Sequence, residues 1–233
     1  MKAAHRTELN ESRTRRPLKS RQSRWAAACA RALARAGVSP NVISVGSIVA
    51  AGIAALCLWG ATYFRSRWSQ AILYFAAAAG IQLRLLCNLL DGLVAVEHAK
   101  ATRSGEIYND LPDRLSDMLI LIMAGYSAAA LGIRFAHELG WIAASLAVLT
   151  AYARVLGRSI GSGIYFIGPM AKQHRMALMT SGCILAALAA IAGLPAVIPG
   201  WILGTALLVI AIGCVLTILR RLRRIAADLE HRP

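Results

Sequence analysis

Six acidic side chains fall in one stretch of the sequence, residues 88–117, which lies between long apolar segments. The whole chain has only 11 aspartates and glutamates, so more than half of them lie in this stretch. An ionised carboxylate is costly in hydrocarbon, so intramembrane acids usually mark a functional site. A metal or substrate site is therefore the favoured interpretation, and a structural ion-pair network is the alternative. The six are Asp91, Glu97, Glu106, Asp110, Asp113 and Asp117.

Carboxylates and amides recur here at helical spacing on two successive segments. Asn88 and Asp91 lie three residues apart on the first segment, and Asn109, Asp113 and Asp117 lie four residues apart on the second. Two antiparallel helices with this spacing would point oxygen atoms toward each other. Hard oxygen ligands suit Mg²⁺, Mn²⁺ or Ca²⁺, and such ions commonly accompany phosphate groups.

The segments around this stretch are long and apolar enough to span a membrane. The chain of 233 residues is 58% hydrophobic, with a mean hydropathy of +0.56. One span needs about 20 apolar residues. The sequence therefore predicts an all-α integral membrane protein with six transmembrane helices. We expect them at about 41–63, 71–98, 105–131, 139–160, 176–195 and 201–219.

An amphipathic helix is expected before the first span, at residues 24–36. Trp25, Cys29 and Leu33 share one face of this helix, and arginines occupy another. This pattern is typical of an interfacial helix on the cytoplasmic leaflet, although a plain extension of the first span is the alternative. Ser39 is the expected N-cap of the first span, because a proline follows it at the first helical position.

The net charge of +15 is distributed as expected for a membrane protein with its basic loops on one side. This distribution argues against nucleic acid as a partner and for contact with anionic lipid. Lysine and arginine are concentrated at both ends of the chain, so we expect both termini in the cytoplasm. The sequence divides into a basic, flexible segment (1–23), a membrane domain (24–219) and a basic cytoplasmic tail (220–233). A bacterial inner membrane is the expected location.

Residues 88–113 resemble the signature of the CDP-alcohol phosphatidyltransferase family, D-x2-D-G-x2-A-R-x8-G-x3-D-x3-D. Every spacing matches, but the first and third aspartates are Asn88 and Asn109, and the arginine is Val96. The chain is therefore similar to a divergent member with a degenerate signature. The residues that keep the family's types are Asp91, Gly92, Ala95, Gly105 and Asp113.

The resemblance implies a membrane enzyme of phospholipid biosynthesis. Such an enzyme moves a phosphatidyl group from CDP-diacylglycerol to a small polar alcohol and releases CMP. It uses one or two Mg²⁺ or Mn²⁺ ions, and Asp113 would be the general base. The resemblance also suggests a homodimer. The CDP group would contact Asp91, Gly92, Ala95 and Gly105.

Metal ligands are expected at the four signature positions and at two further aspartates that replace the lost charge. Residues equally far from the loop at about 101–104 should lie at equal depth, so partner numbers should sum to about 205. This places Asp117 level with Asn88. The alternative for Asp117 is a buried ion pair with Arg84. The candidate metal ligands are Asn88, Asp91, Asn109, Asp110, Asp113 and Asp117.

Basic residues at the inner end of the fourth span and the start of the fifth flank a loop that contains Gly168. They suit an acceptor phosphate, and positive-inside topology alone is the alternative. The candidates are Arg154, Arg158, Lys172 and Arg175.

Two other functions compete with the transferase. A catalytically impaired relative that binds CDP-lipid or lipid headgroups as a partner subunit is favoured by the missing aspartates. An ion-coupled transporter is disfavoured, because the sequence lacks interrupted spans in matching halves.

Overall fold

The structure is a computed structural model that describes residues 24–97 and 105–230. The predicted segment 1–23 and the loop at about 101–104 lie outside the described residues. Within these two ranges the chain is helical, without strands, as predicted. The seven described helices are α2 (Arg24–Arg35), α3 (Pro40–Gly60), α4 (Arg67–Glu97), α5 (Gly105–Ala130), α6 (Ala136–Ser159), α7 (Lys172–Ile191) and α8 (Val197–Glu230).

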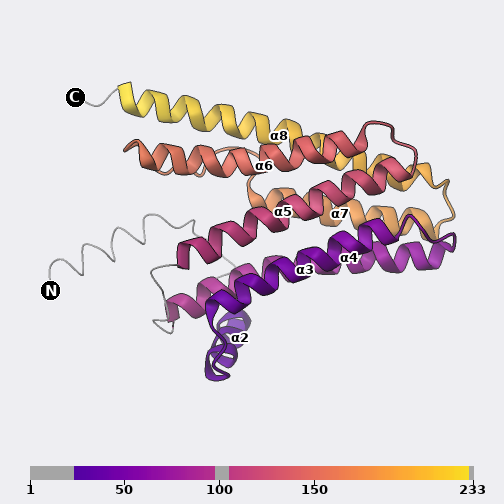
Figure 1. Cartoon of the computed structure of the whole chain (residues 1–233), viewed down its shortest axis with the longest axis horizontal. Helices are drawn as coiled ribbons and strands as arrows, with labels where there is room; N and C mark the ends of the chain where they lie inside the picture. The colour runs from indigo at the N-terminus through magenta and orange to yellow at the C-terminus, as the bar shows by residue number, and fades with distance from the viewer. Residues whose placement is uncertain (1–23, 98–104, 231–233) are drawn as a thin grey trace.

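Six of these helices form a closed bundle with parallel long axes (Figure 1). Each packs against two main neighbours, in the order α3, α4, α7, α8, α6, α5 and back to α3. The helices α4 and α5 follow each other in the sequence but touch only slightly, because α3 packs along both. The α7 helix, which is remote in sequence, packs closely on α4.

Small side chains let the helices approach closely. The interior is rich in alanine, and two glycines make one of the closest contacts between helices. Gly125 of α5 faces Gly140 of α6, and a Cβ on Gly125 would lie 2.5 Å from the Ala136 carbonyl oxygen. Small residues at helix interfaces are the usual means of packing in membranes, where hydrophobic burial between helices gives little.

The α3 helix begins where the sequence predicted. The Ser39 hydroxyl accepts a hydrogen bond from the Val42 amide at 3.3 Å, and Pro40 occupies the first turn. The cap satisfies one of the donors that a helix start leaves without a partner.

The α2 helix lies across one end of the bundle, at a steep angle to the other helices (Figure 1). Its buried face consists of Ala26 and Ala30, which join an apolar cluster with Leu90, Leu93 and other residues of α4. Trp25 remains exposed on the outside of the helix. This contact places α2 beside the end of α4 that carries the signature residues.

Five of the helices are long and apolar enough to cross a membrane, namely α3, α4, α6, α7 and α8. Among the six bundle helices the exception is α5, because its first turns carry Asp110, Asp113, Arg114 and Asp117. The protein is therefore an integral membrane protein. The last helix continues to Glu230, beyond the expected end of the sixth span at about 219.

Candidate functional site

The two signature aspartates are buried at the end of the bundle that carries α2. Asp91 lies near the C-terminus of α4 and Asp113 in the third turn of α5, and each is only 4% exposed. Asp91 interacts electrostatically with both Asp113 and Lys172. The structure thus gathers the two carboxylates and one predicted phosphate ligand in a single cluster.

Asp113 is surrounded by donors. Its Oδ1 accepts from the amide Nδ2 of Asn88 and, at 3.3 Å, from Nη2 of Arg84. Its Oδ2 accepts from the ammonium group of Lys172, which also donates to Oδ1 of Asn88 at 2.9 Å. The amide of Asn88 therefore donates to Asp113 and accepts from Lys172. Lys172 in turn links Asn88 and Asp113, the first and last signature positions.

Asp117 lies one turn deeper and is held by two arginines. Its Oδ1 accepts from Nη2 of Arg84 at 2.7 Å, and its Oδ2 accepts from Nη2 of Arg175 at 2.6 Å. The side chain of Asp117 is 1% exposed and that of Arg84 is 0% exposed. The predicted ion pair between Arg84 and Asp117 is therefore confirmed, and the second arginine is an addition that the sequence did not suggest.

The pairing across the hairpin differs from the expected register by about one turn. Asn88 meets Asp113, and Arg84 meets Asp117, whereas the depth rule placed Asn88 level with Asp117. Helix α4 is described as far as Glu97 and α5 from Gly105, so the described hairpin is centred earlier in the sequence than the expected loop at about 101–104. The long side chain of Arg84 also reaches along the helix axis.

Asp91 has one satisfied oxygen and one free oxygen. Its Oδ2 accepts from the Ser44 hydroxyl of α3 at 2.6 Å. Its Oδ1 is buried without a hydrogen-bond partner among the residues that the structure describes. A buried carboxylate oxygen without a donor is costly, so this atom is suited to a ligand that the protein does not supply. Ser44 was missed in the sequence, where only its place on the same face as Ser47 could have suggested it.

The remaining acidic candidate, Asp110, lies nearer the surface. Its carboxylate is 3.4 Å from Arg114 and 3.3 Å from Arg154, and its side chain is 47% exposed. Arg154 also lies over the ring of Phe166. Asn109 is exposed and does not join the buried carboxylates.

The predicted basic residues therefore separate into two groups. Lys172 and Arg175, in the first turn of α7, reach the buried carboxylates. Arg154 and Arg158, in the last turns of α6, do not: Arg154 pairs with Asp110, and Arg158 lies one turn further along the helix.

The loop that leads into α7 is held by α8. The Met170 amide donates to Oγ1 of Thr217 at 3.0 Å, and Arg221 donates from Nε to the Ile167 carbonyl at 3.1 Å. Gly168 has φ of +118°, and a Cβ there would lie 2.5 Å from the Thr217 methyl. This loop fixes where α7 begins and therefore where Lys172 enters the cluster.

The donor set suits a single hard cation. Among the side chains that the structure describes, no three His, Cys, Asp or Glu residues lie close enough together to hold a metal ion. The unpartnered Oδ1 of Asp91 and the adjacent carboxylate of Asp113 are oxygen donors of the type that Mg²⁺ and Mn²⁺ prefer. These two aspartates are therefore the described residues that would hold such an ion.

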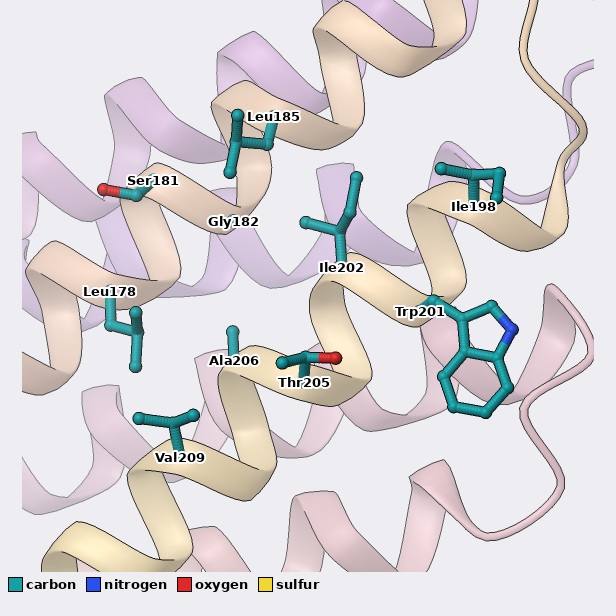
Figure 2. A pocket seen from close by; sticks show the side chains of 10 residues that line it. All are labelled: Leu178, Ser181, Gly182, Leu185, Ile198, Trp201, Ile202, Thr205, Ala206 and Val209. Carbon is teal, nitrogen blue, oxygen red and sulfur yellow. The ribbon is translucent and has the colours of Figure 1, made fainter.

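An apolar groove lies between α7 and α8, away from these groups (Figure 2). Leu178, Leu185, Trp201 and Val209 contribute to its walls, and Thr205 is among its few polar residues. The groove has no titratable side chain in its described lining, so the chemistry is expected at the carboxylate cluster instead.

The chain is similar to known proteins in both sequence and fold. No protein-family model matches the chain. A phosphatidylinositol phosphate synthase of Mycolicibacterium smegmatis is 26% identical over 205 residues, which cover 84% of this chain and 81% of that protein.

Solved structures share the fold. The phosphatidylinositol phosphate synthase of Mycobacterium tuberculosis with CDP-DAG bound has a TM-score of 0.68 at 21% identity, covering 87% of this chain and 94% of that one. The same synthase in complex with manganese and citrate has a TM-score of 0.69 at 21% identity, covering 87% and 90%.

Proposed function

We propose that this chain is a divergent member of the CDP-alcohol phosphatidyltransferase family and that it transfers a phosphatidyl group from CDP-diacylglycerol to a polar alcohol. The observation that carries the proposal is the buried pair of Asp91 and Asp113 at the signature positions, with one oxygen of Asp91 unpartnered. CMP is the leaving group.

A single divalent ion, Mg²⁺ or Mn²⁺, is the proposed cofactor, with Asp91 and Asp113 as its ligands. The manganese complex of the tuberculosis synthase supports this choice. When bound, the ion would neutralise charge on the pyrophosphate and on the departing CMP. The contacts of the CDP group are proposed at Gly92, Ala95 and Gly105, the small residues of the signature.

The protein's own groups account for the proton transfer. The alcohol oxygen bonds to the phosphorus of the phosphatidyl group, and the bond from that phosphorus to the oxygen of CMP breaks. The alcohol proton passes to Asp113, the proposed general base. Lys172 covers one oxygen of Asp113, so the lysine must move or share that oxygen while the proton is accepted.

A phosphate-bearing alcohol is the proposed acceptor. Arg154 and Arg158 lie at the inner end of α6, and the Arg154 side chain is 28% exposed, so it remains accessible to a ligand. The product class of the mycobacterial relative, a phosphorylated phospholipid by its name, supports the same choice. Arg175 is instead committed to Asp117 at the base of the site.

The membrane arrangement is proposed as six spans with α2 on the cytoplasmic surface. The α5 helix has 26 residues and reaches ~39 Å at about 1.5 Å per residue, which is enough to cross about 30 Å of hydrocarbon. Its charged side chains that face the bundle are paired. An even number of spans puts both termini on one side, which the basic ends place in the cytoplasm.

The test is a CMP-release assay with purified protein, CDP-diacylglycerol, Mn²⁺ or Mg²⁺, and a panel of alcohols with and without phosphate. We expect CMP release with at least one alcohol, and a loss of at least ~100-fold in Asp91→Asn and Asp113→Asn. Glu138→Gln is the matched control, since Glu138 is an exposed acid at the start of α6.

A catalytically impaired protein that binds CDP-lipid is the second candidate. It is favoured by the neutral Asn88 at a position where the signature has an aspartate. It is also favoured by the hydrogen bonds that Asp113 accepts from Arg84 and Lys172. Metal-dependent CDP binding without CMP release from any alcohol would support this candidate and contradict the transferase.

A further inference from the structure

Lys172 lies between the first and the last residue of the signature, Asn88 and Asp113. Its ammonium group donates to Oδ1 of Asn88 at 2.9 Å and to Oδ2 of Asp113. The amide nitrogen of Asn88 in turn donates to the other oxygen of Asp113. The three side chains thus form a closed hydrogen-bonded set in which each one contacts the other two.

Asn88 fits this set because it is an amide. Its nitrogen is a donor to Asp113, whereas its oxygen is an acceptor for Lys172. A carboxylate at position 88 would place two negative oxygens against each other, and their repulsion would have to be offset by a shared proton or a cation. The amide and the lysine therefore suit each other, and together they remove the need for a metal ion at this point.

The charges of the buried cluster indicate that it would hold one divalent ion. Asp91, Asp113 and Asp117 carry three negative charges, and three cationic side chains contact or face them, so the protein groups sum to zero. One divalent ion would give the cluster two positive charges, which match a bound diphosphate. Two ions would leave an excess of buried positive charge. The cationic side chains are Arg84, Lys172 and Arg175.

The unsatisfied oxygens also allow one ion. Both oxygens of Asp113 and both oxygens of Asp117 accept hydrogen bonds from side chains. Only Oδ1 of Asp91 is buried and without a partner among the described carboxylates. A lysine ammonium is a compact point charge with three donors, which suits it to stand between oxygen atoms.

We propose that the Lys172 ammonium, held by Asn88 and Asp113, takes the place of a second divalent ion, so that the protein binds one divalent ion per chain, with Asp91 as its principal ligand. The proposal rests on the proposed function, because the diphosphate is that of the CDP-lipid. It assigns to Lys172 a role at the reacting diphosphate in place of a second ion.

The experiment counts Mn²⁺ ions on the purified full-length protein by equilibrium binding and by electron paramagnetic resonance. We expect one ion per wild-type chain, without the spin coupling of a neighbouring Mn²⁺ pair, and loss of that ion in Asp91→Asn. Two coupled ions per wild-type chain, or none, would overturn the proposal.

A set of variants tests the role of Lys172 itself. The double variant Asn88→Asp, Lys172→Ala restores an acidic ligand beside Asp113 and removes the ammonium, so we expect its count to rise from one ion to two. The matched control is Asn88→Asp with Lys172 retained, for which we expect one ion. Two ions in this control would contradict the proposal, since the lysine would not be excluding the second ion.

The count remains informative if a variant does not fold, because the wild-type count alone can overturn the proposal. CMP release is measured separately. One bound ion without CMP release would refute the transferase activity but not the proposed single ion. CMP release with two bound ions would refute only the role of Lys172.

Discussion

Replacing Asp117 by asparagine tests whether the deepest part of the site is structural. The substitution keeps the size of the side chain and removes the charge that Arg84 and Arg175 share at 2.7 and 2.6 Å. Removing one partner of a buried ion pair costs about 3–5 kcal/mol, because the other charge stays buried. We expect Asp117→Asn to fold with much reduced stability.

The magnitude should lie near the lower end of that range. Arg84 would retain the Asp113 carboxylate at 3.3 Å and the Asp113 carbonyl at 3.1 Å. Arg175 would retain the Met170 carbonyl at 3.0 Å and the Thr150 hydroxyl at 3.3 Å. At about 3 kcal/mol, and about 2–4 °C per kcal/mol for a chain of this size, the expected decrease in Tm is ~6–12 °C.

The assay is thermal unfolding in detergent, followed by size-exclusion chromatography. The matched control is Asp110→Asn, whose carboxylate also contacts two arginines but is half-exposed, so its pairs contribute about 0–1 kcal/mol. The double variant Asp117→Asn, Arg84→Met should recover part of the loss, since it removes one uncompensated charge. Equal Tm values for Asp117→Asn and Asp110→Asn would refute the assignment of Asp117 as a structural anion.

Three further outcomes are expected. Ser44→Ala should weaken Mn²⁺ binding by about 10–100-fold, because the hydroxyl orients the buried aspartate of α4, whereas Ser47→Ala should not; equal affinities would contradict this role. Arg154→Ala should raise KM for a phosphate-bearing alcohol by about tenfold and leave KM for CDP-diacylglycerol unchanged, with an unchanged acceptor KM as the contrary result. Gly168→Ala should lower the free energy of unfolding by about 1–3 kcal/mol, since alanine is strained at φ of +118° and clashes with α8; an unchanged Tm would contradict the stated packing.

The sequence predicted well those features that depend on local spacing. The start of α3 at Ser39 and Pro40 follows from a capping residue and a proline, and both are present. The pairing of Arg84 with Asp117 follows from the cost of leaving an arginine without a partner deep in a bundle. Such inferences need only helical geometry and the energetics of charge.

Contacts between helices that are remote in sequence could not be predicted in the same way. The order of helices around the bundle places α7 on α4, and only this order brings Lys172 to Asn88. Ser44 reaches Asp91 from the neighbouring helix, because α3 packs along α4, but spacing does not tell which faces of two consecutive helices meet. Spacing along one segment carries no information about which other segment it faces.

The small side chains of the bundle have a consequence for how the protein adapts to membranes of different thickness. Alanine loses no rotamer freedom on packing, and a contact as close as that of Gly125 with Gly140 leaves little room for one helix to slide past another. A mismatch between protein and bilayer would therefore be met by tilting of the whole bundle rather than by shifts of single helices. The height of the carboxylate cluster relative to the lipid headgroups would then follow the tilt, and so depend on the lipid composition around the protein.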